Sequence, residues 1–100
     1  TILGPWFVDA GDIPDPHNLD LSTFVNGERT QHGNTCDFVN DIPALIEYLS
    51  EFMTLQAGDV ILTGTPEGVA DVKVGDEVVC EIESIGRLTN TIVSDQDFGR

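Results

Sequence analysis

The apolar residues of this chain recur with two different periods, and the first of them predicts a β-hairpin. Apolar and polar side chains alternate along Leu19–Val25, a pattern typical of a strand with one covered face. Asn26 and Gly27 follow directly, and this pair readily adopts the two positive φ angles of a type I′ turn. We therefore expect Leu19–Val25 to pair with a second strand over Glu28–His32.

The second period is helical. Asp41 is placed to cap a helix that begins at Ile42, and Pro43 lies in the first turn, where a missing N–H does no harm. An apolar stripe at helical spacing follows. It consists of Leu45, Ile46, Leu49, Phe52 and Met53. The pattern predicts one helix from Ile42 to Met53, with Leu45, Leu49 and Phe52 packed against a sheet.

Further apolar runs bounded by turn residues predict the remaining strands. They are Ile2–Val8, Val60–Thr63, Glu77–Glu83 and Leu88–Val93. In the third of these runs the alternation places Val78, Cys80 and Ile82 on one face, which we expect to be the buried one. Together the elements predict an α+β fold, mostly β, in which antiparallel strands outnumber one main helix.

The charge balance excludes two classes of partner. The 100 residues include 18 Asp and Glu against 4 Lys and Arg, a formal net charge of −14. Nucleic acids and anionic membrane surfaces are bound through clustered basic residues, so neither is an expected partner. The sequence also lacks a run apolar enough for a membrane helix and the basic start of a signal peptide. We therefore expect a cytoplasmic protein, with Cys36 and Cys80 as free thiols.

The most distinctive candidate for chemistry is the loop Thr63–Val69. Two glycines and a proline directly after an apolar run fix a sharp loop whose backbone can approach a ligand closely. Thr63 and Thr65 add hydroxyl donors. A nucleotide-binding P-loop is excluded, because Val69 rather than Lys follows Gly68. On local features alone, a ligand-binding loop and a strained strand exit without a ligand both remain open.

Other polar residues offer no catalytic arrangement. His17 and His32 have no second His or Cys at metal-ligand spacing, so both are expected to be ordinary loop histidines. Glu81 and Glu83 share one strand face, the spacing of a Glu-x-Glu metal pair, but the alternation turns both toward solvent. No nucleophile with a neighbouring base can be assembled. The sequence therefore assigns no catalytic residue and no metal ligand.

Taken together, several segments resemble the C-terminal half of the fumarylacetoacetate hydrolase family. In chain order they are Gly4–Val8, Asp12–Leu19, Val25–Glu28, Gly33–Thr35, Ile46–Leu55, Gly58–Val69 and Val74–Val78. The resemblance covers nearly the whole chain and implies the C-terminal part of that family's β-roll fold. Residues 1–100 are then expected to be the C-terminal fragment of a single catalytic domain, which agrees with the abrupt apolar start at Ile2.

The resemblance implies that the intact protein is an enzyme. The expected activity is that of a metal-dependent isomerase/decarboxylase acting on 2-oxo or 2-hydroxy-diene dicarboxylates from aromatic-acid catabolism. A C–C hydrolase of the acylpyruvate, fumarylpyruvate or fumarylacetoacetate type is an alternative. An alternative of another class is a non-catalytic binding or assembly module that retains the fold. Family members are usually dimers or larger, so the resemblance also implies a homo-oligomer.

The site residues implied by the resemblance form one wall of a substrate site. Gly64, Thr65 and Pro66 match the family's Thr-Gly-Thr-Pro loop, whose second threonine and backbone contact the substrate carboxylate or keto group. Gly4 and Pro5 match the strand exit beside the family's active-site lysine. The family binds Mg²⁺ or Mn²⁺ through a Glu-x-Glu pair and an Asp, all placed before its Gly-Pro-Trp segment. The metal ligands and the lysine are therefore expected upstream of this chain.

Overall fold

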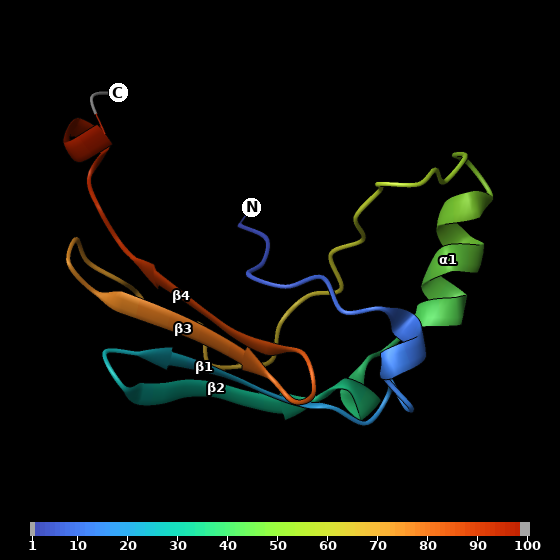
Figure 1. Ribbon diagram of the computed structural model, residues 1–100, viewed down its shortest axis with the longest axis horizontal. Coiled ribbons are helices and arrows are strands. Elements are labelled where there is room, and N and C mark those ends of the chain that lie inside the picture. Colours follow the sequence, from blue (N-terminus) through green and yellow to red (C-terminus); the bar gives the residue numbers. More distant parts are fainter. Residues whose placement is uncertain (1, 99–100) are drawn as a thin grey trace.

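A four-stranded antiparallel sheet forms the body of the computed structural model, which describes residues 2–98 (Figure 1). The strands, ordered β2-β1-β3-β4, are β1 (Asp20–Val25), β2 (Glu28–Asn34), β3 (Glu77–Ile82) and β4 (Gly86–Thr91). The described helices are α1 (Ile42–Ser50) and three short 3₁₀ helices, η1 (Ala10–Asp12), η2 (Thr35–Asp37) and η3 (Asp95–Phe98). The predicted α+β class, mostly β with one main helix, is confirmed.

The predicted hairpin of β1 and β2 is also confirmed, and its turn does more than reverse the chain. Asn26 and Gly27 have φ angles of 51° and 82°, both in the left-handed region. The Asn26 side chain donates from Nδ2 to Asp76 Oδ1 at 2.9 Å. Its Oδ1 accepts from the Glu77 N–H, also at 2.9 Å. The turn therefore fastens the hairpin to the start of β3.

The buried apolar core is small and lies partly on the face opposite the predicted one. Val79 in β3 is 3% exposed and Leu19, just before β1, is 7% exposed. Cys80, on the other face of β3, is exposed, so the prediction that it faces the interior is wrong. Phe24 pairs with Val79 in register, and the Arg87 guanidinium lies 5.9 Å from the centre of the Phe24 ring. An aromatic ring beside Val79 therefore shields the face that alternation assigned to solvent.

Helix α1 begins as predicted but ends earlier. Asp41 Oδ1 accepts from the Ala44 N–H at 2.8 Å, which is the expected N-cap. The helix ends at Ser50 rather than Met53. The helix stands beyond the end of the sheet (Figure 1), because η2 leads the chain away from β2. The Phe52 side chain is 60% exposed. The predicted packing of Leu45, Leu49 and Phe52 against the sheet is therefore wrong, and Leu49 instead lines a cavity with residues 59–62. No helix within residues 2–98 is long and apolar enough to cross a bilayer.

Two of the predicted strands are irregular segments. Ile2–Val8 and Val60–Thr63 form no ladder within the described residues, and Leu62 is 70% exposed. Both predictions are wrong, because a strand needs a hydrogen-bonded neighbour as well as apolar side chains. Strand β4 also begins earlier than predicted, since the chain already reverses at Ser84, whose φ is 64°.

The junction between the hairpin turn and β3 leads to a prediction about acid stability. Asn26 Nδ2 and the Lys73 N–H both donate to the Asp76 carboxylate and hold its pKa below the ordinary 3.8. A lowered carboxyl pKa stabilises the fold above the ordinary value, and this contribution is lost as the pH falls through the lowered pKa. In the full-length protein, Asp76→Asn should therefore lower the melting temperature at neutral pH, and the difference from wild type should shrink in acid. A difference that persists well below pH 3.8 would contradict this role of the carboxylate.

Candidate functional site

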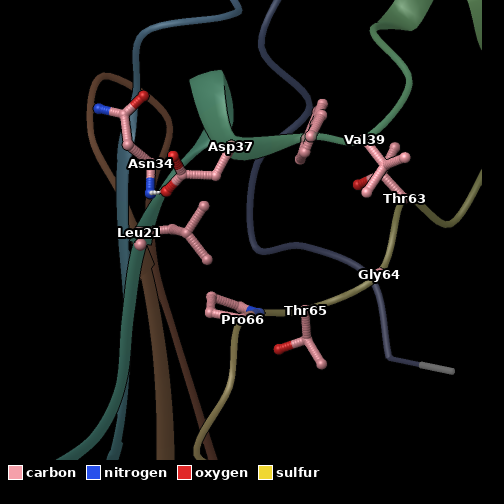
Figure 2. A pocket seen from close by; sticks show the side chains of 10 residues that line it. Leu21, Asn34, Asp37, Val39, Thr63, Gly64, Thr65 and Pro66 are labelled. Atoms are coloured by element: carbon pink, nitrogen blue, oxygen red, sulfur yellow. Dashed lines mark hydrogen bonds between the residues drawn. The ribbon is translucent and has the colours of Figure 1, made fainter.

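The segment Thr63–Pro66, here called the threonine loop, forms one wall of a cavity of about 210 Å³ (Figure 2). The opposite wall includes Leu21 of β1, Asn34 at the end of β2, and Asp37 of η2. These segments are far apart in the sequence and meet only in the folded chain. The structure thus brings the three predicted loop residues, Gly64, Thr65 and Pro66, to one cavity.

Strand β2 lies against the end of the threonine loop at Pro66 and against Gly68 just beyond it. Gln31 Nε2 donates a hydrogen bond to the Pro66 carbonyl oxygen at 2.7 Å. A Cβ added to Gly33 would lie 3.0 Å from Pro66 Cγ, and a Cβ added to Gly68 would collide with the Thr30 carbonyl oxygen. Gly68 also has a φ of 103°, which side chains disfavour. The loop therefore rests directly on residues 30–33, which we call the seat.

The hydroxyl-bearing side chains of the threonine loop are accessible. Thr63, Gly64 and Thr65 are all exposed, and Gly64 adopts a φ of 93° with open space beside it. In Figure 2 the Thr65 side chain projects away from the Asp37 carboxylate on the opposite wall. The hydroxyl of Thr65 is thus free of the acidic wall and able to donate to an anionic ligand.

A more apolar cavity of about 340 Å³ adjoins the first one. The two cavities share Leu21, Phe38, Thr63 and Gly64. Ile82 at the end of β3 is among the apolar residues that line the 340 Å³ cavity but not the 210 Å³ one. The same loop therefore borders one cavity with mixed polar and apolar walls and one with mostly apolar walls, an arrangement suited to a ligand that has a polar group and a hydrocarbon segment.

Gly4 and Pro5 lie at a different cavity, of about 120 Å³. Its lining includes Trp6 and the apolar side chains of Ile82 and Leu88. The described structure does not bring Gly4 and Pro5 to the cavity that Thr65 lines. Their place beside a substrate stays a prediction.

The sequence reasoning missed Asn34 and Asp37, which form a capping box around η2. The Asn34 side chain accepts from the Cys36 N–H at 2.9 Å, and the Asp37 carboxylate accepts from the Asn34 N–H at 3.4 Å. An Asn followed three positions later by an acid was the signal for this cap. The cap brings the Asp37 charge to the cavity wall.

Cys36 lies beside this wall but is not prepared to act as a nucleophile. It is free and exposed, and its Sγ donates to Asp37 Oδ1 at 3.6 Å. Partial desolvation and the Asp37 charge raise the pKa of the Cys36 thiol above the ordinary 9.0. The thiol therefore stays protonated and weakly reactive at neutral pH.

The described residues do not fit a metal ion. No group of three or more His, Cys, Asp or Glu side chains comes together within residues 2–98. Glu81 forms an ion pair across β3 and β4 at 3.8 Å. Glu83 Oε1 accepts from the Asp20 N–H at 3.0 Å, and His17 Nε2 accepts from the Ile42 N–H at 3.1 Å. We therefore derive no catalytic step that passes through a metal.

The profile of the fumarylacetoacetate (FAA) hydrolase C-terminal family matches residues 1–93. The chain belongs to this family. The resemblance read from the sequence is confirmed, and FAA hydrolase relatives include both isomerase/decarboxylases and hydrolases. The 4-hydroxyphenylacetate degradation bifunctional isomerase/decarboxylase of Salmonella dublin is 60% identical over 96 residues, which are 96% of this chain and 22% of that protein.

Solved structures of FAA hydrolase relatives share the fold. The maleylpyruvate hydrolase of Sphingobium sp. SYK-6, in complex with manganese(II) and pyruvate, has a TM-score of 0.88 and 44% identity, covering 90% of this chain and 34% of that one. The 2-hydroxyhepta-2,4-diene-1,7-dioate isomerase of Mycobacterium marinum has a TM-score of 0.85 and 47% identity, covering 92% and 35%. The chain thus spans about a fifth of the length of the curated relative named above, since it covers 22% of it.

The contact between Cys36 and Asp37 leads to a prediction about thiol reactivity. In the full-length protein, Asp37→Asn removes the negative charge that disfavours the thiolate, so Cys36 should be alkylated faster by iodoacetamide at neutral pH. The rate is measured by mass spectrometry of the peptide that contains Cys36, with the peptide of exposed Cys80 as the internal control. An unchanged rate for Cys36 would show that the Asp37 charge does not govern the thiol.

Proposed function

We propose that the protein containing this chain is an isomerase/decarboxylase of 2-oxo or 2-hydroxy-diene dicarboxylates in aromatic-acid catabolism. In this proposal residues 1–100 are the C-terminal part of a single catalytic domain. The observation that carries it is the threonine loop, fixed on β2 with exposed hydroxyls at the edge of a cavity. The identity of 60% to a bifunctional isomerase/decarboxylase supports the choice of reaction.

In this proposal the attraction for a dianionic substrate comes from the metal and from basic residues upstream of this chain, and the threonine loop is the part of the acidic chain that can hold a carboxylate. The chain carries a net charge of −14 and Asp37 lies on the opposite wall, so a carboxylate avoids that side. Thr65 supplies a neutral hydroxyl donor, and the open space at Gly64 lets an anionic group approach the backbone. The proposed role of the threonine loop is to hold one carboxylate or keto oxygen in place.

The proposal includes a divalent cation, Mg²⁺ or Mn²⁺. A solved relative, the maleylpyruvate hydrolase, is in complex with manganese(II) and pyruvate. Because residues 2–98 contain no fitting cluster, we assign the metal ligands to the part of the protein that precedes Gly4, as the family resemblance implies. We also propose a cytoplasmic homo-oligomer, by analogy with the family. Neither nucleic acid nor a membrane is proposed as a partner.

A C–C hydrolase is the second candidate function. It is favoured by the TM-score of 0.88 to a maleylpyruvate hydrolase. Assays of the full-length protein with 2-hydroxyhepta-2,4-diene-1,7-dioate and with maleylpyruvate separate the two candidates. Isomerisation of the diene, seen as a change in ultraviolet absorption, supports the first; release of pyruvate from maleylpyruvate alone supports the second.

Thr65→Val in the full-length protein tests the role of the loop. Valine keeps the shape of threonine and removes the donor, so folding should be almost unchanged. The value of kcat/KM should fall about ten- to a hundred-fold, the worth of a hydrogen bond to a charged group, about 1.5–3 kcal/mol. Thr54→Val, at an exposed position outside both cavities of the loop, is the matched control. A folded Thr65→Val protein with wild-type kcat/KM removes Thr65 from the site.

The 100-residue chain on its own should be inactive. The residues described in it provide no cluster of metal ligands, and a metal-dependent reaction needs one to polarise a keto acid. The measurement is turnover of a 2-oxo dicarboxylate by the isolated chain with added Mg²⁺ or Mn²⁺. Metal-stimulated turnover would show that the chain carries its own metal site.

A further inference from the structure

Gln31 is a polar side chain in a position that a strand normally gives to an apolar one. It is 8% exposed and is the one buried residue of β2. A buried primary amide is costly unless its N–H groups find acceptors. Gln31 Nε2 finds its acceptor outside the sheet, in the carbonyl oxygen of Pro66 at 2.7 Å.

This hydrogen bond anchors the threonine loop to the sheet. In the described part of the chain, residues 60–72 form no backbone–backbone hydrogen bond with another segment. Among the residues that the structure describes, the bond from Gln31 is the one hydrogen bond that joins residues 60–72 to the sheet. The loop therefore depends on a side chain for the anchoring that a strand would obtain from a ladder.

The glycines beside the bond let the loop come close enough to form it. Gly33 leaves room for the Pro66 ring, and Gly68 leaves room for the Thr30 carbonyl oxygen. Thr30 lies where the register between β1 and β2 shifts, so an irregular point of the ladder receives the loop. The close packing at the two glycines sets the distance between the loop and the seat. The hydrogen bond from the Gln31 amide sets where along the seat Pro66 lies.

We propose that Gln31 is a positioning residue, which places the Thr65 hydroxyl by holding the carbonyl of the next residue. Proline fixes its own φ and restricts the backbone conformation of the residue before it. The position of Pro66 therefore largely determines the position of Thr65. This inference rests on the proposed function of the threonine loop. Gln31 itself is placed outside the substrate site, because it is 8% exposed and lines neither of the two cavities that the loop borders.

The test uses the full-length protein and two substitutions of Gln31. Gln31→Met keeps the length of the side chain and removes the donor. It should speed amide hydrogen exchange in the peptide that covers residues 63–68 and lower kcat/KM about ten-fold, the worth of one lost hydrogen bond. Gln56→Met makes the same chemical change at an exposed position and should alter neither reading.

Gln31→Glu provides a second measurement, the pH dependence of kcat/KM, which should not change if Gln31 has only a structural role. The ionised carboxylate repels the Pro66 carbonyl, whereas the protonated acid donates to it. The ratio of kcat/KM for Gln31→Glu to that for Gln31→Met should therefore rise as the pH is lowered. Both variants keep the neighbouring titratable groups Arg29, His32 and Glu67. Dividing one kcat/KM by the other therefore removes the effect of these groups on the pH dependence.

The outcomes separate this inference from the proposed function. Unchanged exchange in both Gln31 variants overturns the anchoring, and faster exchange with wild-type kcat/KM overturns the positioning of Thr65. If Thr65→Val itself has no kinetic effect, the proposed function fails, while the exchange reading still decides whether Gln31 holds the loop. Should Gln31→Met not fold, Gln31→Glu decides alone: relative to wild type at the same pH, exchange in residues 63–68 must be faster at neutral pH and return toward the wild-type rate in acid for the inference to stand.

Discussion

The pairing of β1 with β3 is the constraint on which the rest of the structure depends. Leu21 pairs with Ile82 and Val25 with Val78, so the ladder closes a long excursion of the chain that contains η2, α1 and the threonine loop. Closing such a loop costs conformational entropy. Because few apolar groups are buried, the hydrogen bonds of the ladder must offset much of this cost. Asn26 reinforces the ladder at one end through its bonds to Asp76 and Glu77.

The local elements were predictable because their signals lie next to one another in the sequence. The hairpin follows from Asn26 and Gly27, and the start of α1 follows from Asp41. Both depend on interactions within a few residues, which propensity and capping rules describe well. The two false strands show the limit of those rules, since an apolar run states what a side chain prefers but not whether a neighbouring strand is present.

The candidate site was predictable only on one side. The threonine loop carries a recognisable motif, and the structure places Gly64, Thr65 and Pro66 at a cavity. The seat did not appear in the sequence reasoning, because Gln31 and Pro66 are distant in the chain and a lone Gln in a polar strand has no motif. Only the tertiary fold brings an amide to a proline carbonyl, so such contacts escape inference from neighbours in sequence.

The two walls of the cavity are built by different rules. The threonine loop meets β2 mainly through backbone atoms, glycines and one amide, whereas the opposite wall presents side chains such as Asp37 and the exposed Val39. Replacing a side chain on the opposite wall changes the charge and shape of the cavity without disturbing the seat. Under the proposed function, one framework could keep the contact with one end of a ligand constant while substitutions on the facing wall alter the space for the other end.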